Sequence, residues 1–374
     1  MDQSHDMLPH MTTTPTFTPT TIKKKKTATG FTMGGMTTVK PPREVPGGWE
    51  LKPASGRVAG AIFIGLLAAF WNGITWTMLI QTWRTEQGLF AGGITLFLSV
   101  FVLIGAAIAW GFIHQLLKAI FTPRLTLKLG HPRLIVGQET DLAWTITGSR
   151  HRLADLKISL VLREECQYRR GTDTVTDRHE AQATIAYEGS EPDADGRCTL
   201  ILPPHAPPSF SVKSNQLVWA IRLTGTVSGL PDVDDEYPIA VDAAPTGNAS
   251  IVAAPLPEGT ELPDSSPLLV LTNNGVDVLP GTPVAGVVRA PGKAVTLRLR
   301  WATSGKGDQQ GEIAARCDLA PNTAGFIMIL PSLPPLWLGT VLSLTWHLEA
   351  EVDGALLASM TLTTSTPTSA PSVA

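Results

Sequence analysis

The hydrophobic pattern of the chain opens with two long apolar segments, Val58–Ile80 and about Leu89–Leu117. Neither contains Asp, Glu, Lys or Arg, and each is longer than the roughly 20 apolar residues with which a helix crosses a hydrocarbon core. Only Gln81 to Gly88 separate them. The pattern predicts two transmembrane helices, 58–80 and 89–117, forming a hairpin whose two ends lie on one side of the membrane.

From Phe121 onward the apolar positions alternate with polar ones at a period of two. The clearest runs are Leu125, Leu127 and Leu129, then Leu142, Trp144 and Ile146, then Leu156, Ile158, Leu160 and Leu162. Such alternation, interrupted by Gly, Pro, Asp and Asn, is typical of half-buried strands. Many short strands with turns between them predict a sandwich or barrel over this region of about 250 residues.

Four landmarks recur in the same order along this region. Leu202-Pro203 and the turn Pro207–Phe210 precede a strand with Trp219, and Leu330-Pro331 and the turn Pro334–Trp337 precede a strand with Trp346. Upstream, Leu156–Leu160 resembles Val295–Leu299, and Val136–Glu139 resembles Leu279–Thr282. The recurrence predicts two related sandwiches in tandem, with Trp219 and Trp346 as equivalent core residues.

Composition marks the boundaries of these units. Residues 244–266 are dense in Ala, Pro, Gly, Ser and Asp, which is typical of a linker, although a short strand at Ser250–Ala253 could belong to one sandwich. The sandwiches are expected at 121–243 and 267–363. Polar tails without apolar periodicity, expected to be disordered, occupy residues 1–48 and 364–374.

Charge around the apolar segments predicts the orientation. Lys and Arg cluster before the first segment and after the second, whereas the turn between them offers only Arg84. Basic loops stay cytoplasmic, so we expect both termini and the β domains inside and the turn outside. The Lys23–Lys26 run acts either as a topology signal or as a contact with anionic headgroups. Trp71 and Trp110 suit the membrane interface and helix packing equally.

Composition and motifs point away from several classes of function. The net charge of −3 does not suit a nucleic-acid binder, and no nucleotide-binding, hydrolase or zinc-protease motif occurs. Cys166, Cys198 and Cys317 lack disulfide or metal-ligand spacing, and Cys198 and Cys317 are expected as small buried side chains. We therefore assign no catalytic, cofactor-binding or metal-binding residue and expect no cofactor.

Two clusters nevertheless invite a test for chemistry. Asp232, Asp234, Asp235 and Glu236 form the densest acidic group, expected as a solvated turn between strands, with a cation site as the alternative. Asp193-Ala194-Asp195-Gly196 begins like a calcium loop, but Pro204 occupies the twelfth position, where an EF-hand has an acid. A β-turn is the expected structure there. His114, His131, His151 and His179 have no evident partner in the sequence.

The proline-rich approach to a Trp-bearing strand, repeated twice and followed in the first copy by Leu230-Pro231-Asp232 and Tyr237-Pro238-Ile239, resembles the arrestin-like fold. The resemblance covers about Phe121 to Leu362 and extends to uncharacterised bacterial membrane proteins with a two-helix anchor. It implies an all-β pair of immunoglobulin-like sandwiches behind a transmembrane α-helical hairpin, in a bacterial inner membrane. Such sandwiches act through their surfaces and edges, so the resemblance implies binding or scaffolding.

The expected function is that of a membrane-anchored, non-enzymatic adaptor that binds a protein partner through its sandwiches. The alternative is an accessory subunit of a membrane transport or envelope complex, recognised through the hairpin, for which Gly105 and Ala109 offer a weak helix-contact motif. The expected partners are the lipid bilayer and a protein, and not a nucleic acid.

Overall fold

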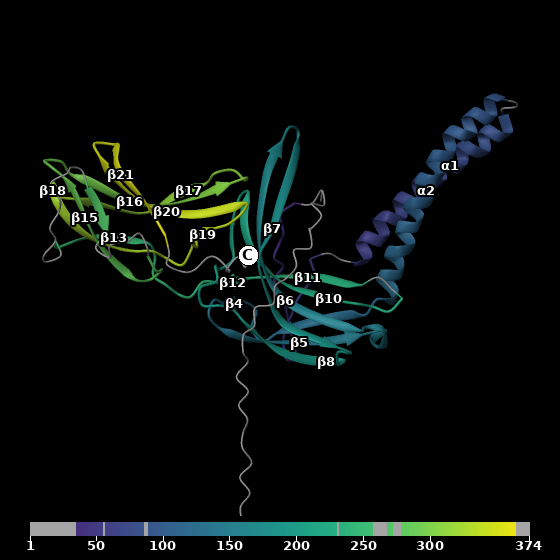
Figure 1. The fold of residues 1–374 in the computed structure, drawn as a ribbon, viewed down its shortest axis with the longest axis horizontal. Coiled ribbons are helices and arrows are strands. Elements are labelled where there is room, and N and C mark those ends of the chain that lie inside the picture. Colours follow the sequence, from purple (N-terminus) through teal and green to yellow (C-terminus); the bar gives the residue numbers. More distant parts are fainter. Residues whose placement is uncertain are drawn as a thin grey trace, which may run out of the picture. The chain divides into compact units, whose positions relative to one another are not determined.

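Two apolar helices are followed by a largely all-β chain in a computed structural model of the protein (Figure 1). The structure describes residues 35–54, 57–85, 89–229, 232–256, 268–271 and 278–363. The expected order of an apolar helix pair and then β structure is thereby confirmed. The C-terminal tail predicted at 364–374 and the turn residues 86–88 lie outside the described residues.

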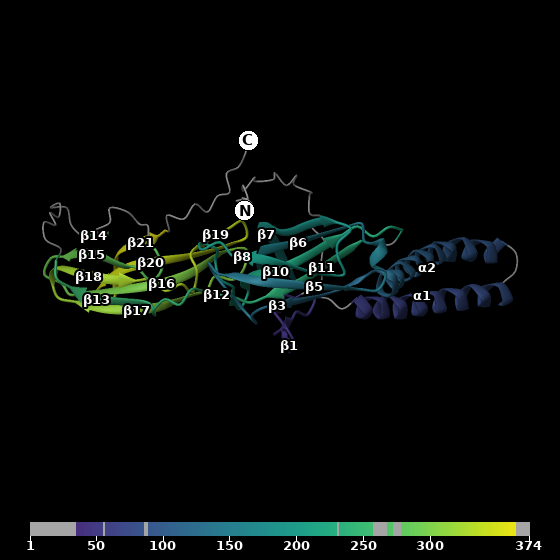
Figure 2. The same ribbon diagram turned by 90° about the horizontal axis from the view of Figure 1, so that it is seen from below.

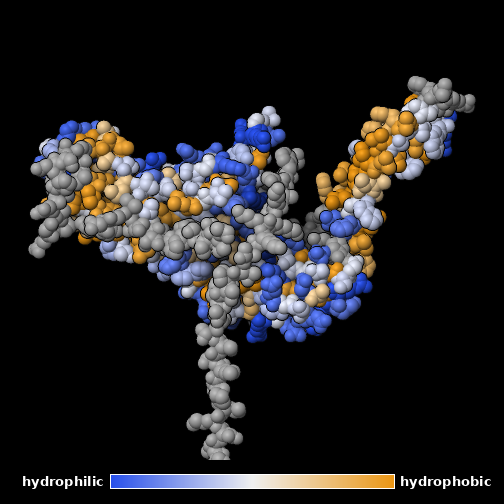
Figure 3. Space-filling model, in the orientation of Figure 1, coloured by the Kyte–Doolittle hydropathy of each residue, from blue (hydrophilic) through white to orange (hydrophobic). Residues whose placement is uncertain are grey.

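The helices α1 (Arg57–Thr85) and α2 (Leu89–Phe121) run antiparallel side by side (Figures 1 and 2). Both are long and apolar enough to cross a membrane, over Ala61–Thr85 and Gly92–Leu117. Figure 3 shows apolar residues over much of their visible surface, and Leu66 and Leu103 are about two-thirds exposed. An outward apolar face of this kind suits lipid as its surroundings.

Small and polar side chains join the two helices. The Asn72 amide donates to the carbonyls of Ala68 and Gly105, and the Trp71 indole donates to the Phe101 carbonyl at 3.1 Å while its ring stacks on the Phe101 ring. A Cβ at Gly105 would lie 2.5 Å from the Asn72 amide oxygen. Gly105 therefore serves contact within the hairpin. Trp71 packs between the helices, whereas Trp110 is 72% exposed and is free to meet lipid.

The first β region begins directly after α2 and builds two facing sheets around one core. Its strands are β3 (Arg124–Leu129), β4 (Leu134–Ile135), β5 (Glu139–Thr147), β6 (Asp155–Arg170), β7 (Asp173–Ser190), β8 (Asp195–Ile201), β9 (Phe210–Val212), β10 (Asn215–Gly225), β11 (Val233–Ile239) and β12 (Val241–Asp242). Sheet I has the order β1-β2-β3-β5-β8, in which β1 (Arg43–Val45) and β2 (Gly48–Glu50) precede the helices in the sequence. Sheet II has the order β11-β10-β6-β7, with β9 beside β10, and β12 and β4 form a small parallel pair. Leu127 and Trp144 of sheet I pack in the same core as Leu160 and Trp219 of sheet II.

The second β region repeats this plan around a second core. Its strands are β13 (Ser250–Ala254), β14 (Leu268–Leu271), β15 (Pro283–Ala290), β16 (Val295–Gly305), β17 (Gly311–Leu319), β18 (Asn322–Ile329), β19 (Trp337–Leu338), β20 (Leu342–Val352) and β21 (Ala355–Leu362). Sheet III has the order β13-β18-β15-β14, and sheet IV the order β17-β16-β20 with β19 and β21 also on β20. The short strand foreseen near 250–253 thus belongs to the second region, where it pairs with β18.

Strand register makes the repeat concrete. Sheet II pairs β10 with β6, β9 and β11, and sheet IV pairs β20 with β16, β19 and β21 in the same arrangement. Trp219 and Trp346 occupy the same place in their sheets, each is 1% exposed, and each indole donates to a proline carbonyl twelve residues earlier, Pro207 or Pro334. The prediction that both are core residues is confirmed.

One landmark of the repeat is shifted by a residue. Gly137 and Gly281 both have a positive φ, near +80°, and the amides of Gln138 and Thr282 close the two turns at 3.1 Å onto carbonyls three residues earlier. The structural match therefore sets Gly137 on Gly281, whereas the sequence match, read position by position, sets Gly137 on Pro280. Glycine is needed there because other residues adopt this backbone conformation only with strain.

The described part of the predicted N-terminal tail is structured. Residues 35–54, which we call the strap, include β1 (Arg43–Val45) and β2 (Gly48–Glu50), and β2 pairs with β3 at the edge of sheet I. Leu51 is buried in the first core. The expectation of disorder through residue 48 is therefore wrong from Gly35 onward, because polar and Pro-rich sequence here bonds to the β region and needs no core of its own.

Candidate functional site

A patch of sheet II bonds to other parts of the chain through both of its faces. Its members are consecutive on each strand and in register across the sheet, and they are Asp177, Arg178 and His179 on β7, Glu164, Glu165 and Cys166 on β6, and Asn215 and Gln216 on β10. Successive side chains of a strand point to opposite faces. Alternate members of this two-faced patch therefore meet different partners: the strap on one face and the second β region on the other.

The strap lies on the row formed by Arg178, Glu165 and Gln216. Thr37 donates its amide and its hydroxyl to the two Glu165 carboxylate oxygens, at 2.7 and 2.5 Å. The Gln216 amide donates to Glu165 at 2.6 Å and to the Thr37 carbonyl at 3.1 Å. Arg178 joins Glu165 at 3.1 Å and donates to the Gly35 carbonyl at 2.8 Å. Every member of the row thus contacts the strap.

On the opposite face, Glu164 holds the loop before β20. One of its carboxylate oxygens accepts from the Thr340 amide at 3.2 Å, and the other accepts from Val341 at 2.7 Å and Leu342 at 3.1 Å. Successive backbone N–H groups form an anion-binding concavity. Burying a carboxylate is costly unless it is hydrogen-bonded, and here three donors satisfy it.

Further bonds of this face tie the second β region at its other loops. Cys166 donates its thiol to the Val341 carbonyl, and Asn215 donates to the Asp308 carbonyl at 2.8 Å. Lys306 donates to Asp177 at 2.6 Å, and His179 lies 3.1 Å from the Thr340 hydroxyl. Beside them, Trp337, Val341, Leu342 and Leu344 of the second region are buried in the first core. The contact is thus apolar as well as polar.

The charges of the patch are compensated locally. Glu164 is 1% exposed and Glu165 is fully buried. Burial alone would raise the pKa of Glu165, but hydrogen bonds from Thr37 and Gln216, with the charge of Arg178, outweigh it and hold the pKa below its usual value. The Asp177 hydrogen bond raises the pKa of Lys306. Glu165 is therefore an ionised group fixed by its neighbours.

Burial raises the pKa of the Cys166 thiol to about 11, and likewise that of Cys198. Thiols with so high a pKa carry little thiolate near neutral pH and react slowly. All three cysteines are free; Cys166 is buried, whereas Cys198 and Cys317 are half-buried against the two cores. The expectation that Cys198 and Cys317 are buried is met only in part.

The acidic cluster is dispersed by its strand. Asp234, Asp235 and Glu236 lie in β11 rather than in a turn, and only Asp232 precedes it. Asp232 accepts the Val227 amide, Asp234 pairs with Arg222, and Glu236 pairs with Arg163. Among the residues that the structure describes, no group of three His, Cys, Asp or Glu could hold a metal ion.

The other candidates separate as well. Asp195 opens β8 and accepts the Thr145 hydroxyl, while Asp193 pairs with Arg150 at 3.5 Å. His114, His131 and His151 are exposed, and only His179 belongs to the two-faced patch. Of the eight patch residues, only His179 and Cys166 stand out in the sequence, and neither is assigned to a site there.

Glu164 and Glu165 were missed, although a signal for them exists. The alternation of Leu156, Ile158, Leu160 and Leu162 continues to position 164, so Glu164 is an acid at an inward position of a buried strand. Such an acid requires dedicated donors. Those donors lie more than 170 residues away at Thr340 to Leu342, which no local pattern indicates.

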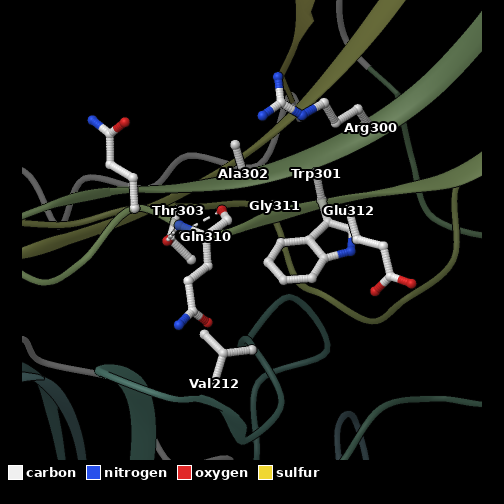
Figure 4. Close-up of a pocket in the computed structure, with 9 residues that line it drawn as sticks. Val212, Arg300, Trp301, Ala302, Thr303, Gln310, Gly311 and Glu312 are labelled. Atoms are coloured by element: carbon white, nitrogen blue, oxygen red, sulfur yellow. Dashed lines mark hydrogen bonds between the residues drawn. The ribbon is translucent and has the colours of Figure 1, made fainter.

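A hollow of about 760 Å³ opens beside the patch (Figure 4). The β16–β17 hairpin lines most of it, and Val212 of β9 closes one side. In Figure 4 the Trp301 indole and the Gln310 side chain point toward Val212, whereas Arg300 points away. Trp301 also meets the Phe210 ring edge-on, with centroids 5.9 Å apart. The hollow therefore follows the line along which the two β regions meet.

Comparison with known proteins assigns no relative. No family model matches the chain, and no curated protein matches it.

Proposed function

We propose that the protein is a membrane-anchored adaptor whose β regions bind a protein partner at the membrane surface, without catalysis. The observation that carries the proposal is strand β13 at the edge of sheet III, whose sequence Ser-Ile-Val-Ala-Ala has no charge. Val252 in its middle is 52% exposed. The edge strand β17 of sheet IV, by contrast, carries Glu312, Arg316 and Asp318.

An edge strand presents unpaired N–H and C=O groups, which proteins usually protect with charge. An uncharged edge is suited to receive a strand from another protein, whose main chain supplies affinity and whose alternate side chains supply specificity. Sheets II and IV have the same arrangement of strands, and this repeat supports our assignment of both β regions to an arrestin-like, immunoglobulin-like fold. Surface recognition is the use we assign to it, on the analogy of fold alone.

We further assign both termini and both β regions to the cytoplasmic side of a bacterial inner membrane. Basic residues cluster before α1 and after α2, and the turn between the helices has few, which supports this orientation. A partner would then be a protein of the cytoplasm or of the inner leaflet.

The test is site-specific photo-crosslinking of the full chain in its own membrane. A photoreactive residue at Val252 should crosslink one protein partner, and Val252→Asp should abolish the association. Leu256→Asp is the matched control, because Leu256 is 47% exposed and lies two residues beyond β13. Unchanged association after Val252→Asp would contradict strand addition.

The accessory-subunit alternative is tested in the same experiment. Its support is the outward face of the hairpin, where Leu66 is 67% and Leu103 is 70% exposed. Photoreactive residues at these positions should give only lipid adducts if the adaptor proposal holds. A specific protein crosslinked from Leu66 or Leu103, with none from Val252, would favour the transport or envelope complex.

A further inference from the structure

We propose that the strap is a conformational lever: its seating on sheet II sets how tightly the second β region is held, so displacement at the membrane is passed to that region. The inference rests on the two-faced patch and on the connection of the strap to α1, and it can be measured without any partner.

The two contacts share the same strands at adjacent positions. Glu165 and Gln216 bond to the strap, and their chain neighbours Glu164 and Asn215 bond to the second β region. On β7, Arg178 bonds to the strap, and its chain neighbours Asp177 and His179 bond to the second β region. A shift of the residues that bond to the strap therefore also shifts the backbone of the residues that bond to the second β region.

The strap is also placed to move with the membrane helix. Ala54 donates its amide to the Glu236 carbonyl at 2.7 Å, and α1 begins at Arg57. The strap thus contacts sheet II at Thr37, sheet I through β2 and the Glu236 strand at Ala54. A shift of α1 acts on a strap that is held at Ala54, through β2 and, farthest from the helix, at Glu165.

Loss of the strap removes two hydrogen-bond donors from Glu165. Glu165 would keep Arg163, Arg178 and Gln216 but lose both Thr37 donors, and the loss of donors from a buried carboxylate is destabilising. The strands must then shift to admit water or new donors, and Glu164 moves with them. By thermodynamic reciprocity, loosening the second region must loosen the strap by the same factor.

The experiment measures amide hydrogen exchange of the full chain in lipid nanodiscs. Thr37→Glu places a second carboxylate against Glu165 and should release the strap; Thr38→Glu, at an exposed neighbour, is the matched control. We expect exchange at Val341 and Leu342 to rise by about fivefold or more in Thr37→Glu and not in Thr38→Glu.

The reciprocal variant acts from the other side. Lys306→Glu opposes Asp177 and should speed exchange of the Thr37 amide, whereas Lys293→Glu, whose partner Asp353 lies within the second region, should not. This arm also decides the case if Thr37→Glu fails to fold. Faster exchange in the strap with none at Val341 and Leu342, or a strap that stays protected in Thr37→Glu, overturns the proposal.

Discussion

At the residue scale, Trp219 and Trp346 show how one solution is used twice. Each fills a core, and each indole donates to a proline carbonyl, that of the buried Pro207 or that of the half-buried Pro334. Trp219→Phe and Trp346→Phe should each lower the free energy of unfolding by about 1–3 kcal/mol or more, because the smaller phenyl ring leaves part of the core unfilled and the proline carbonyl loses its donor. Chemical denaturation of the full chain in detergent measures the loss. Trp110→Phe, on the exposed face of α2, should change nothing, and an equal loss there would refute the assignment.

Glu165 makes a prediction about pH. Its pKa is lower in the folded chain than the ordinary value of 4.5, so the folded state binds this proton less readily than the unfolded state. The stability that Glu165 contributes is therefore present above about pH 4.5 and is lost as pH falls through the lower, folded pKa. Glu165→Gln should be less stable than the native chain at pH 7, and the gap should narrow in acid. A gap that widens below pH 4.5 would contradict this account of Glu165.

The core tryptophans could be predicted from the sequence, whereas the buried carboxylates of the patch could not. Trp219 and Trp346 were predicted because apolar alternation and a recurring proline turn are local patterns. The two-faced patch was not, because its carboxylates are satisfied by Thr37 and Leu342, which are 128 and 178 residues distant from their partners. When the bonding partners are so far apart in the sequence, the only local sign of the contact is an acidic residue at an otherwise apolar position of a strand.

At the element scale, the hairpin depends on close contact between α1 and α2. Gly105→Leu should lower thermal stability, because a Cβ there would lie 2.5 Å from the Asn72 amide oxygen. Overpacking of this kind costs about 1–3 kcal/mol. Gly111→Leu is the matched control on the same helix, where a Cβ meets nothing within 4 Å. Thermal denaturation in detergent compares the two variants, and equal melting temperatures would contradict the packing described.

The elements themselves were mostly foreseeable. Uninterrupted apolar runs predicted both helices, although these continue to Thr85 and Phe121, past the predicted ends at 80 and 117. Alternation predicted the strands of both β regions. The sequence does not predict the strap, because β1 and β2 have three residues each, too few to show the alternation of apolar and polar positions that marks a strand.

At the scale of the whole molecule, orientation in the membrane is directly testable. In a chain with Cys198 and Cys317 replaced by Ser, a cysteine at Gln87 should react with an impermeant thiol reagent in intact cells, and one at Ser149 should not. Cys166 can stay, because burial raises its thiol pKa to about 11. The opposite labelling pattern would reverse the topology that the flanking Lys and Arg residues indicate.

The central claim is that the two β regions are joined by the two-faced patch rather than connected by a free linker. The direct measurement is the distance distribution between spin labels at Thr199 and Ala314. The full chain, with Cys198 and Cys317 replaced by Ser as above, is studied in nanodiscs. Labels at Thr199 and Glu188, both in the first region, give the reference width. The account predicts one distribution as narrow as the reference. A broad distribution, typical of two domains on a flexible linker, would contradict it.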